Sequence, residues 1–206
     1  MKRTLFATAL FACAATALPA HAAITQWTAG NNHWYEPVIA PGTGGISWTD
    51  ANAAAIAKGG YLATITSAPE NSFVYSLISG NLAYWRPANG ANTSGPWLGG
   101  RQTDELAEPS GHWSWVTGES WSYTNWNPGE PNNFYPGEDY LHYLGVGGPP
   151  AAVWNDAEVF GHAATDAIPG SYIIEYNSFP APEPSSLGIL GLSSLALFAK
   201  RRLQKR

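Results

Sequence analysis

Carboxylate and carboxamide side chains gather in one stretch of the chain, between residues 130 and 156. Glu130-Pro131-Asn132 comes first, Glu138-Asp139 follows, and Trp154-Asn155-Asp156 completes the set. Calcium takes roughly six to eight oxygen ligands from carboxylates, Asn side chains, backbone carbonyls and water. The sequence therefore predicts a Ca²⁺ site with an open coordination position that a pair of neighbouring hydroxyls can fill. Its five side-chain donors are Glu130, Asn132, Glu138, Asn155 and Asp156.

Taken in order, the same motifs resemble a known family. EPN, an ED pair and then WND, downstream of an aromatic and Gly-rich segment, are similar to the sugar-binding signature of C-type lectin-like domains. The likeness covers about residues 27–177 and includes earlier segments at residues 47–53, 59–65, 97–100, 115–118 and 125–126. EPN alone would be an ordinary Pro turn, and WND alone a buried Trp beside an Asx turn. The metal-site interpretation therefore depends on their joint occurrence.

The resemblance implies how a sugar would be held. In the family, EPN accompanies mannose- or glucose-type sugars, whose neighbouring equatorial hydroxyls ligate calcium and hydrogen-bond to the same side chains. The QPD motif that accompanies galactose-type recognition is absent here. The resemblance also implies a cis peptide bond before Pro131 and a shallow pocket, whose useful affinity depends on multivalency. The residues that it assigns to ion and sugar together are Glu130, Asn132, Glu138 and Asn155.

Further matches imply a second calcium ion. Four residues stand at the positions of the family's auxiliary site: Asp104, Glu108, Asn133 and Asp139. Asn133 replaces the more usual Asp, so one negative charge is missing. A solvated acidic loop around residues 104–108 is the alternative interpretation of the first two.

An enzyme is the competing class of function. A glycoside hydrolase needs two carboxyl groups about 5–9.5 Å apart, and the acids of residues 130–156 offer such a pair. Their interleaving with Asn132 and Asn155 favours a cation instead. The histidines lack HExxH or paired zinc spacing and are expected on the surface or in packing, and no Cys or Ser motif provides a nucleophile. We therefore expect no enzyme.

A third class is a calcium-stabilised adhesion or matrix protein that binds another protein. The same fold serves unrelated partners, so the resemblance does not exclude this alternative. The primary prediction is calcium-dependent binding to a surface or matrix polysaccharide.

The elements that must position these residues predict an α+β fold. Ser47 caps a helix that ends at Gly59-Gly60, and Ser67 with Glu70 forms a capping box for a second helix. That helix has Phe73, Leu77 and Ile78 on its apolar face. Strands are expected at residues 61–66, 113–116, 140–144 and 171–176, a polar loop at 81–96, and a long irregular loop at 117–137 that bound metal would order.

Both ends of the chain resemble targeting segments. Residues 1–22 have the basic start, apolar run and small-residue cleavage site of a secretory signal peptide, and residues 24–178 form the expected domain. Residues 180–206 combine Pro-Glu-Pro, a short apolar span and an Arg cluster, similar to a PEP-CTERM sorting signal. The resemblance implies an exosortase-type processing enzyme at the inner membrane of a Gram-negative bacterium. The protein is expected at the cell surface or outside the cell, held transiently or permanently by its C-terminal segment, whose apolar span is shorter than the roughly 20 residues of a transmembrane helix.

The net charge of the expected domain bears on which kinds of partner it can bind. Between residues 23 and 180 three basic residues, Lys58, Arg86 and Arg101, stand against fourteen acidic ones, which gives a formal net charge of −11. No nucleic-acid partner is expected, because phosphate binding needs a basic face.

Cysteine content departs from the family pattern. The only cysteine, Cys13, lies in the expected signal peptide, so the domain lacks the family's disulfides. Ala55, Tyr140 and Ile174 stand about where family cysteines would be. Ten Trp residues, all within the domain, are expected to do more of the core packing.

Overall fold

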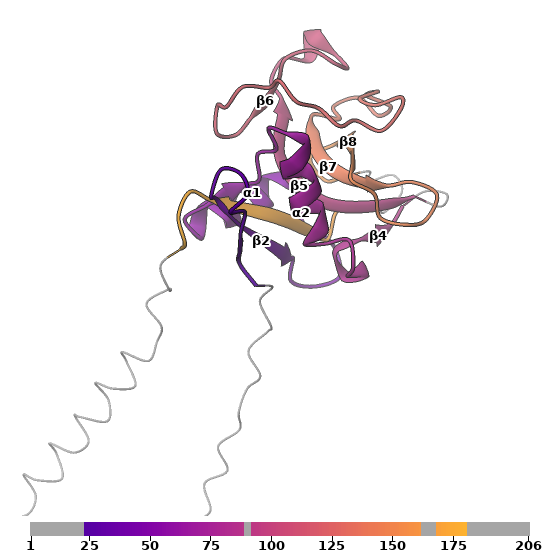
Figure 1. Cartoon of the computed structure of the whole chain (residues 1–206). Coiled ribbons are helices and arrows are strands. Elements are labelled where there is room, and N and C mark those ends of the chain that lie inside the picture. Colours follow the sequence, from indigo (N-terminus) through magenta and orange to yellow (C-terminus); the bar gives the residue numbers. More distant parts are fainter. Residues whose placement is uncertain (1–22, 89–91, 162–167, 181–206) are drawn as a thin grey trace, which may run out of the picture.

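The chain folds around one nine-stranded sheet (Figure 1). The structure, a computed structural model, describes residues 23–88, 92–161 and 168–180. The sheet has the order β1-β2-β9-β5-β7-β8, β3 pairs with β9, and β4 and β6 pair with β5. The path strands are β1 (Thr25–Gln26), β2 (Trp34–Ile39), β9 (Ser171–Tyr176), β5 (Thr93–Gln102), β7 (Tyr140–Gly145) and β8 (Val153–Ala157). The remaining strands are β3 (Tyr61–Leu62), β4 (Arg86–Pro87) and β6 (Trp113–Trp115).

Helix α1 (Trp48–Ala57) begins and ends where the sequence predicts. The hydroxyl of Ser47 accepts the backbone N–H of Asp50 at 3.0 Å, which satisfies one of the donors left open at a helix start. Gly59, just beyond the last turn, has a φ of +80°, the left-handed conformation in which glycine ends helices.

Helix α2 (Ala68–Ser76) starts at its expected cap, but Glu70 does not complete the capping box. Ser67 Oγ accepts the N–H of Glu70 at 3.3 Å. The Glu70 carboxylate does not return to Ser67; it accepts the Thr66 N–H at 2.7 Å and the hydroxyl of Tyr35 at 2.6 Å. Glu70 therefore ties the start of the helix to β2 as well as to the preceding turn.

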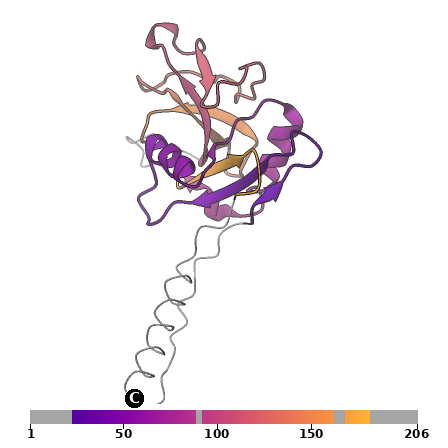
Figure 2. The same ribbon diagram turned by 90° about the vertical axis from the view of Figure 1, so that its left-hand side faces the viewer.

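Two apolar cores lie on the two faces of the sheet, with the helices flanking the strands (Figure 2). Along β9, Ile173 belongs to one core and its neighbours Tyr172 and Ile174 to the other, the alternation expected of a strand buried on both faces. Helix α2 contributes to the first core and α1 to the second. Ala55 and Ile174, where the resemblance implies cysteines, are fully buried in the second core, so apolar packing occupies these positions.

Some segments differ from expectation. The strand expected at residues 61–66 is confined to β3, because the N–H of Thr64 donates to the carboxylate of Glu175 at 2.8 Å and not to a neighbouring strand. Residues 81–96 are more than a polar loop: they contain η1 (Leu82–Tyr84), β4 and the start of β5, since Tyr84 and Trp85 are buried. The strands expected at residues 113–116, 140–144 and 171–176 are confirmed as β6, β7 and β9.

The two ends of the described domain lie close together. β1 pairs with the start of β2, where Gln26 faces Trp34, and the ring of Phe179 packs edge-on against Trp34 with centroids 4.8 Å apart. Both ends leave on the same side of the domain (Figure 1). The expected signal peptide, and the expected sorting segment from residue 181 onward, lie outside the described residues. Within the described residues, no helix has the length and apolar character needed to cross a membrane.

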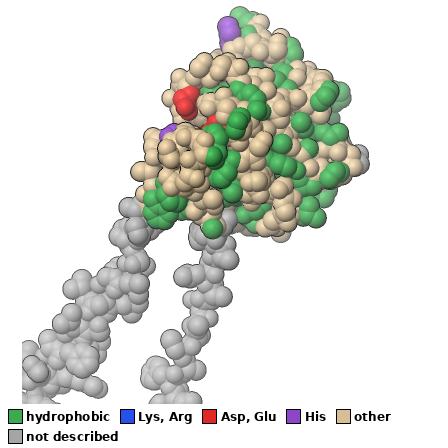
Figure 3. Space-filling model, in the orientation of Figure 1, with side chains coloured by type: hydrophobic (Ala, Val, Ile, Leu, Met, Phe, Trp, Pro, Cys, Tyr) green, Lys and Arg blue, Asp and Glu red, His purple; other side chains and the backbone are tan. Residues whose placement is uncertain are grey.

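The surface agrees with the low number of basic residues. On the face shown in Figure 3, apolar and acidic side chains are visible and no Lys or Arg is seen among the described residues.

Candidate functional site

The long loop after β6 is attached to β8, and this attachment brings two of the donor motifs together. The N–H of Asn127 donates to the Trp154 carbonyl, and the N–H of Trp154 donates to the Asn125 carbonyl, both at 2.9 Å. The N–H of Glu130 then donates to the Asn127 carbonyl at 2.9 Å, just before the Glu130–Pro131 peptide bond, which is cis. The EPN motif therefore lies beside the strand that carries WND.

A tryptophan cluster lies under the loop and holds it. It consists of Trp121 and Trp126 from the loop, Trp113 and Trp115 from β6, and Trp154 from β8. Trp121 packs against Trp115 with ring centroids 4.4 Å apart and against Trp154 at 6.1 Å. Trp154 is fully buried, as expected for a residue that packs the strand. Each such aromatic pair adds about 0.5–1.5 kcal/mol beyond area burial, so the cluster positions the loop by apolar packing.

A pocket of about 250 Å³ opens beside this loop. Four of the five residues predicted for the principal ion line it: Glu130, Asn132, Glu138 and Asn155. The other lining residues are Ala88, Asn92, Asn127, Phe134, Tyr135 and Leu144. The fold thus brings together donors that are 25 residues apart in the sequence.

Asp156, the fifth predicted donor, lies behind the EPN motif. Its Oδ2 accepts the backbone N–H groups of Asn132 at 3.0 Å and Asn133 at 2.8 Å. Its Oδ1 is buried and accepts no hydrogen bond from the described residues. Burial raises the pKa of Asp156 above its ordinary value, and the nearby charge of Glu138 adds to the rise. A cation would stabilise the charged form of such a carboxylate.

The backbone N–H of Phe134 organises two further donors. Both Glu138 Oε2, at 2.6 Å, and Asn132 Oδ1, at 2.7 Å, accept it. Asn133 Oδ1 accepts the N–H groups of Gly137 at 3.0 Å and Glu138 at 3.2 Å, and Asn133 has a φ of +46°, a conformation that Asn tolerates. Residues 132–138 therefore form a tight loop with side-chain oxygens turned inward.

The donor set consists of hard oxygen atoms, the kind of ligand that calcium accepts. Among the described residues, no three carboxylate, imidazole or thiolate groups gather closely enough to hold a metal, so an ion here would depend on amide oxygens as well. Calcium accepts both kinds of oxygen, whereas zinc is bound mainly through nitrogen and sulfur. If bound here, calcium would supply a positive charge that attracts the oxygen atoms of neutral hydroxyls.

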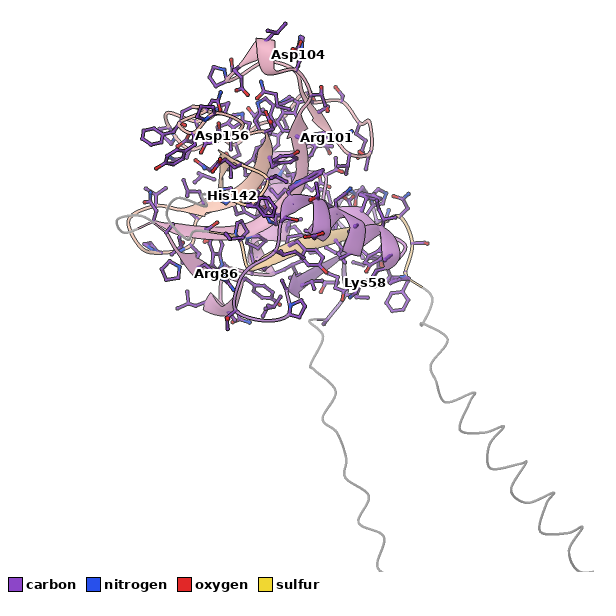
Figure 4. The ribbon with its side chains drawn as sticks, turned by 180° about the vertical axis from the view of Figure 1, so that it is seen from behind. Lys58, Arg86, Arg101, Asp104, His142 and Asp156 are labelled. Atoms are coloured by element: carbon purple, nitrogen blue, oxygen red, sulfur yellow. The ribbon has the colours of Figure 1, made fainter. Side chains whose placement is uncertain are left out.

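Asp104, predicted for the second ion, lies apart from the principal site. It precedes η2 (Glu105–Ala107) near the tip of its loop, well separated from Asp156 (Figure 4). Its Oδ2 is 2.8 Å from Nδ1 of His112, so a histidine lies next to this carboxylate.

The other residues predicted for the second ion lie on different segments. Glu108 follows η2 and precedes a proline with a cis peptide bond. Asn133 lies in the tight loop beside Asp156. Asp139 immediately precedes β7, and its carbonyl accepts a backbone N–H from the end of β5 at 2.8 Å. The second ion stays a prediction.

Some residues that line the pocket or lie behind it were not predicted from the sequence. Phe134 is 72% exposed, with the ring of Tyr135 edge-on at 4.9 Å, and no sequence pattern indicates an exposed loop aromatic. His142, expected on the surface or in packing, is fully buried and directly faces Asn155 in the β7–β8 pair. The hairpin register would have indicated that position, but the sequence alone does not fix a register across so irregular a connection.

Comparison with known sequences agrees with the resemblance. The chain matches the family described as Lectin C-type domain over residues 45–157, more than half of its 206 residues, and the PEP-CTERM protein-sorting motif over residues 180–202. It is 32% identical over 114 residues to the galactose-specific lectin nattectin of Thalassophryne nattereri. That match covers 55% of this chain and 62% of nattectin, so the chain spans less than two thirds of that relative.

Solved structures share the fold at low identity. The mouse scavenger receptor C-type lectin carbohydrate-recognition domain has a TM-score of 0.53 at 21% identity, over 80% of this chain and 100% of that one. A calcium-independent type II antifreeze protein has a TM-score of 0.50 at 19% identity, over 76% and 95%. The α+β fold is therefore shared with a calcium-independent protein, and the fold alone does not decide calcium use. Because the family match covers more than half of the sequence, this chain belongs to the C-type lectin domain family and carries a C-terminal PEP-CTERM sorting motif.

Proposed function

We propose that this protein binds carbohydrate in a calcium-dependent manner and recognises mannose- or glucose-type hydroxyl pairs on a surface or matrix polysaccharide. Membership in the C-type lectin domain family supports carbohydrate binding. The observation that carries the proposal is that Glu130, Asn132, Glu138 and Asn155 line one and the same pocket. The buried Oδ1 of Asp156 behind that pocket supports a bound cation.

The pocket's size bears on affinity. Its volume of about 250 Å³ lies below the roughly 300–1,000 Å³ of typical small-molecule sites. One sugar residue, held by two hydroxyls on the ion and by the side chains of Glu130 and Asn132, is the expected ligand at each site. Single-site affinity would be weak, and clustering on a repetitive polysaccharide would supply avidity.

A glycan panel tests the proposal. The purified protein should bind mannose- or glucose-type glycans in millimolar calcium, and excess chelator should abolish binding. Glu130→Gln combined with Asn132→Asp should change the sugar preference, whereas Asp104→Asn should leave it unchanged. Nattectin is named a galactose-specific lectin, so galactose-type glycans are the competing class on the panel.

Each other result has a definite meaning. A preference for galactose would overturn the mannose or glucose assignment, and binding that survives the chelator would overturn the calcium dependence. Capture of a protein partner that free mannose does not block would favour an adhesion protein.

We propose binding without catalysis. Glu138 and Asp156 are each 1% exposed and accept backbone N–H groups, an arrangement that suits a fixed site better than proton transfer to a substrate. Glycans recovered unchanged after prolonged incubation with the protein would support this, and shortened glycans would contradict it.

We further propose that the domain spans residues 24–178 and is exported, with a segment that an exosortase-type enzyme processes. The PEP-CTERM match at residues 180–202 supports C-terminal sorting. In a host with such an enzyme, deletion of residues 180–206 should move the protein from the membrane or surface fraction to the medium. An unchanged distribution would contradict the role of the segment.

A further inference from the structure

We propose that His142 is a positioning residue that fixes the Asn155 carboxamide, so that its oxygen and not its nitrogen faces the calcium site. This inference rests on the proposed function and adds a residue behind the ligands. His142 is on β7 and Asn155 on β8, and the two are direct partners in the antiparallel register. Side chains of such partners project from the same face of the sheet.

The imidazole of His142 is held rigidly. The residue is fully buried, and the Trp97 ring lies edge-on to it with centroids 5.6 Å apart and an interplanar angle of 76°. Figure 4 shows His142 inside the domain, in the half that also contains Asp156. Burial and this ring contact restrict the orientation of the imidazole beside Asn155.

Backbone contacts decide which ring nitrogen carries the proton. Nδ1 of His142 is 2.7 Å from the Tyr143 carbonyl oxygen. A carbonyl can only accept a hydrogen bond, so Nδ1 must carry the hydrogen. In the neutral ring Nε2 is then an acceptor, and it lies 3.3 Å from Nδ2 of Asn155. The Tyr143 carbonyl thus sets the tautomer, and the tautomer requires an amide N–H from Asn155.

The second amide hydrogen of Asn155 is also assigned. Nδ2 donates to the backbone carbonyl of Asp156, another group that can only accept. Both contacts require nitrogen at this branch of the carboxamide, and Oδ1 is consequently the branch directed away from the imidazole. Because Asn155 lines the pocket and calcium binds oxygen, this orientation is the one that can provide a ligand.

Removal of the His142 Nε2 acceptor should lower the affinity for calcium although no predicted ligand is changed. His142→Leu keeps an apolar side chain against Trp97 but leaves the amide without Nε2. The carboxamide then loses one of the two contacts that select its orientation, so a larger fraction of the protein presents nitrogen to the ion. Loss of such a supporting partner typically costs about 10- to 100-fold in metal affinity.

Calorimetric titration with Ca²⁺ and terbium luminescence measure this effect. His142→Leu should lower the affinity for Ca²⁺ by about 10- to 100-fold. His142→Gln, whose amide oxygen can replace the Nε2 acceptor, should recover most of that affinity. Ser94→Ala is the matched control, because the Ser94 hydroxyl lies 3.5 Å from the other ring nitrogen, Nδ1. Thermal unfolding in chelator reports whether each variant folds.

The outcomes separate this inference from the proposed function. Equal weakening by the Leu and Gln variants, or no weakening by either, would overturn the role of His142 alone. Absence of calcium binding in the unchanged protein would overturn the proposed function and this inference with it.

A spectroscopic measurement needs neither calcium nor a variant that folds. Long-range ¹H–¹⁵N correlation spectra of the unchanged protein distinguish the two neutral imidazole tautomers. Hydrogen on Nδ1 of His142 is the expected result. Hydrogen on Nε2 would overturn the proposal, because that nitrogen could then not accept the Asn155 amide.

Discussion

Asp156 is the carboxylate of the site whose charge is most affected by its surroundings. Its carboxylate is buried, its pKa is raised by that burial, and Glu138 adds a second negative charge nearby. Without a cation these two charges oppose each other at low effective dielectric. A cation bound between the two carboxylates would attract both of them and so replace this repulsion by a net attraction.

Asp156→Asn should separate folding from ion binding. In chelator the variant should unfold at the same temperature as the unchanged protein or a higher one, because its amide oxygen still accepts the Asn132 and Asn133 N–H groups. Calcium at 100 times its Kd should stabilise the unchanged protein by about 2.7 kcal/mol and the variant by almost nothing. Thermal unfolding with and without calcium measures both, and Glu119→Gln, an exposed carboxylate outside both predicted ion sites, should behave like the unchanged protein. A calcium response that persists in Asp156→Asn would contradict the assignment.

A second buried carboxylate lies in another part of the domain. Glu175 Oε1 is 2.6 Å from Nδ1 of His33 and 3.1 Å from the Tyr35 hydroxyl, and that hydroxyl also lies 2.6 Å from Glu70. Glu175 Oε2 accepts the Thr64 N–H. Burial outweighs these favourable contacts and raises the pKa of Glu175 from 4.5 to about 7.

Stability should depend on pH through this group. Between pH 4.5 and about 7 the folded state holds a proton on Glu175 that the unfolded state has lost. The contribution of this proton to the free energy of unfolding is fully present below pH 4.5. It is lost as the pH rises towards 7, and the loss is at most about 3 kcal/mol. Glu175→Gln should remove this slope from denaturant unfolding curves, and the exposed control Glu119→Gln should retain it. An identical slope in both variants would count against the raised pKa.

Among the elements, the 117–137 loop is held by side-chain packing and by hydrogen bonds to β8, and not by strands of its own. Between β6 and β7 the described chain forms one isolated bridge, from Trp126 to Trp154, and the tryptophan cluster adds apolar packing to these contacts. We therefore expect the loop to be ordered before any ion binds. Calcium affinity should then benefit, because less of the binding energy is used to order the chain.

Trp121→Ala tests this role of the tryptophan cluster. The loss of its contacts with Trp115 and Trp154 should destabilise the fold by about 2–3 kcal/mol, less than a fully buried Trp because Trp121 is only half-buried. Limited proteolysis in chelator should cut within residues 117–137 of the variant and spare the same loop in the unchanged protein. Trp121→Phe, which keeps a ring, should resist cleavage. Equal cleavage of the unchanged loop would mean that the ion, and not the cluster, orders it.

At the scale of the whole molecule, the position of the two chain ends decides whether the pocket stays accessible when the protein is attached to a surface. The first and last described residues lie on one side of the domain, and Asp156 lies in the part remote from them (Figures 1 and 4). A C-terminal attachment would therefore leave the pocket accessible.

Immobilisation through either end tests this presentation. Protein coupled through its C-terminus should bind glycan as well as protein coupled through its N-terminus, and dense coupling should raise apparent affinity by about 10²–10⁴ over the free protein. Surface plasmon resonance measures both effects. Loss of binding on C-terminal coupling alone would show that attachment obstructs the pocket.

The sequence by itself determined both helices, the strands β6, β7 and β9, the first part of the expected strand at residues 61–66, and the donor motifs. Ser47 and Ser67 mark their helix starts through local caps, which need no distant partner. The order of EPN, ED and WND identified the family, because residue types at set spacings are written in the chain itself.

The tertiary structure decided how distant segments meet. It turned Glu70 to Tyr35, shortened the expected strand at residues 61–66 and buried Trp85 in what reads as a polar loop. It also set His142 against Asn155, since the β7–β8 register decides which side chains face each other. Local preferences act within a few residues, whereas burial, pKa and ligand support arise from contacts between segments that only the folded chain brings together.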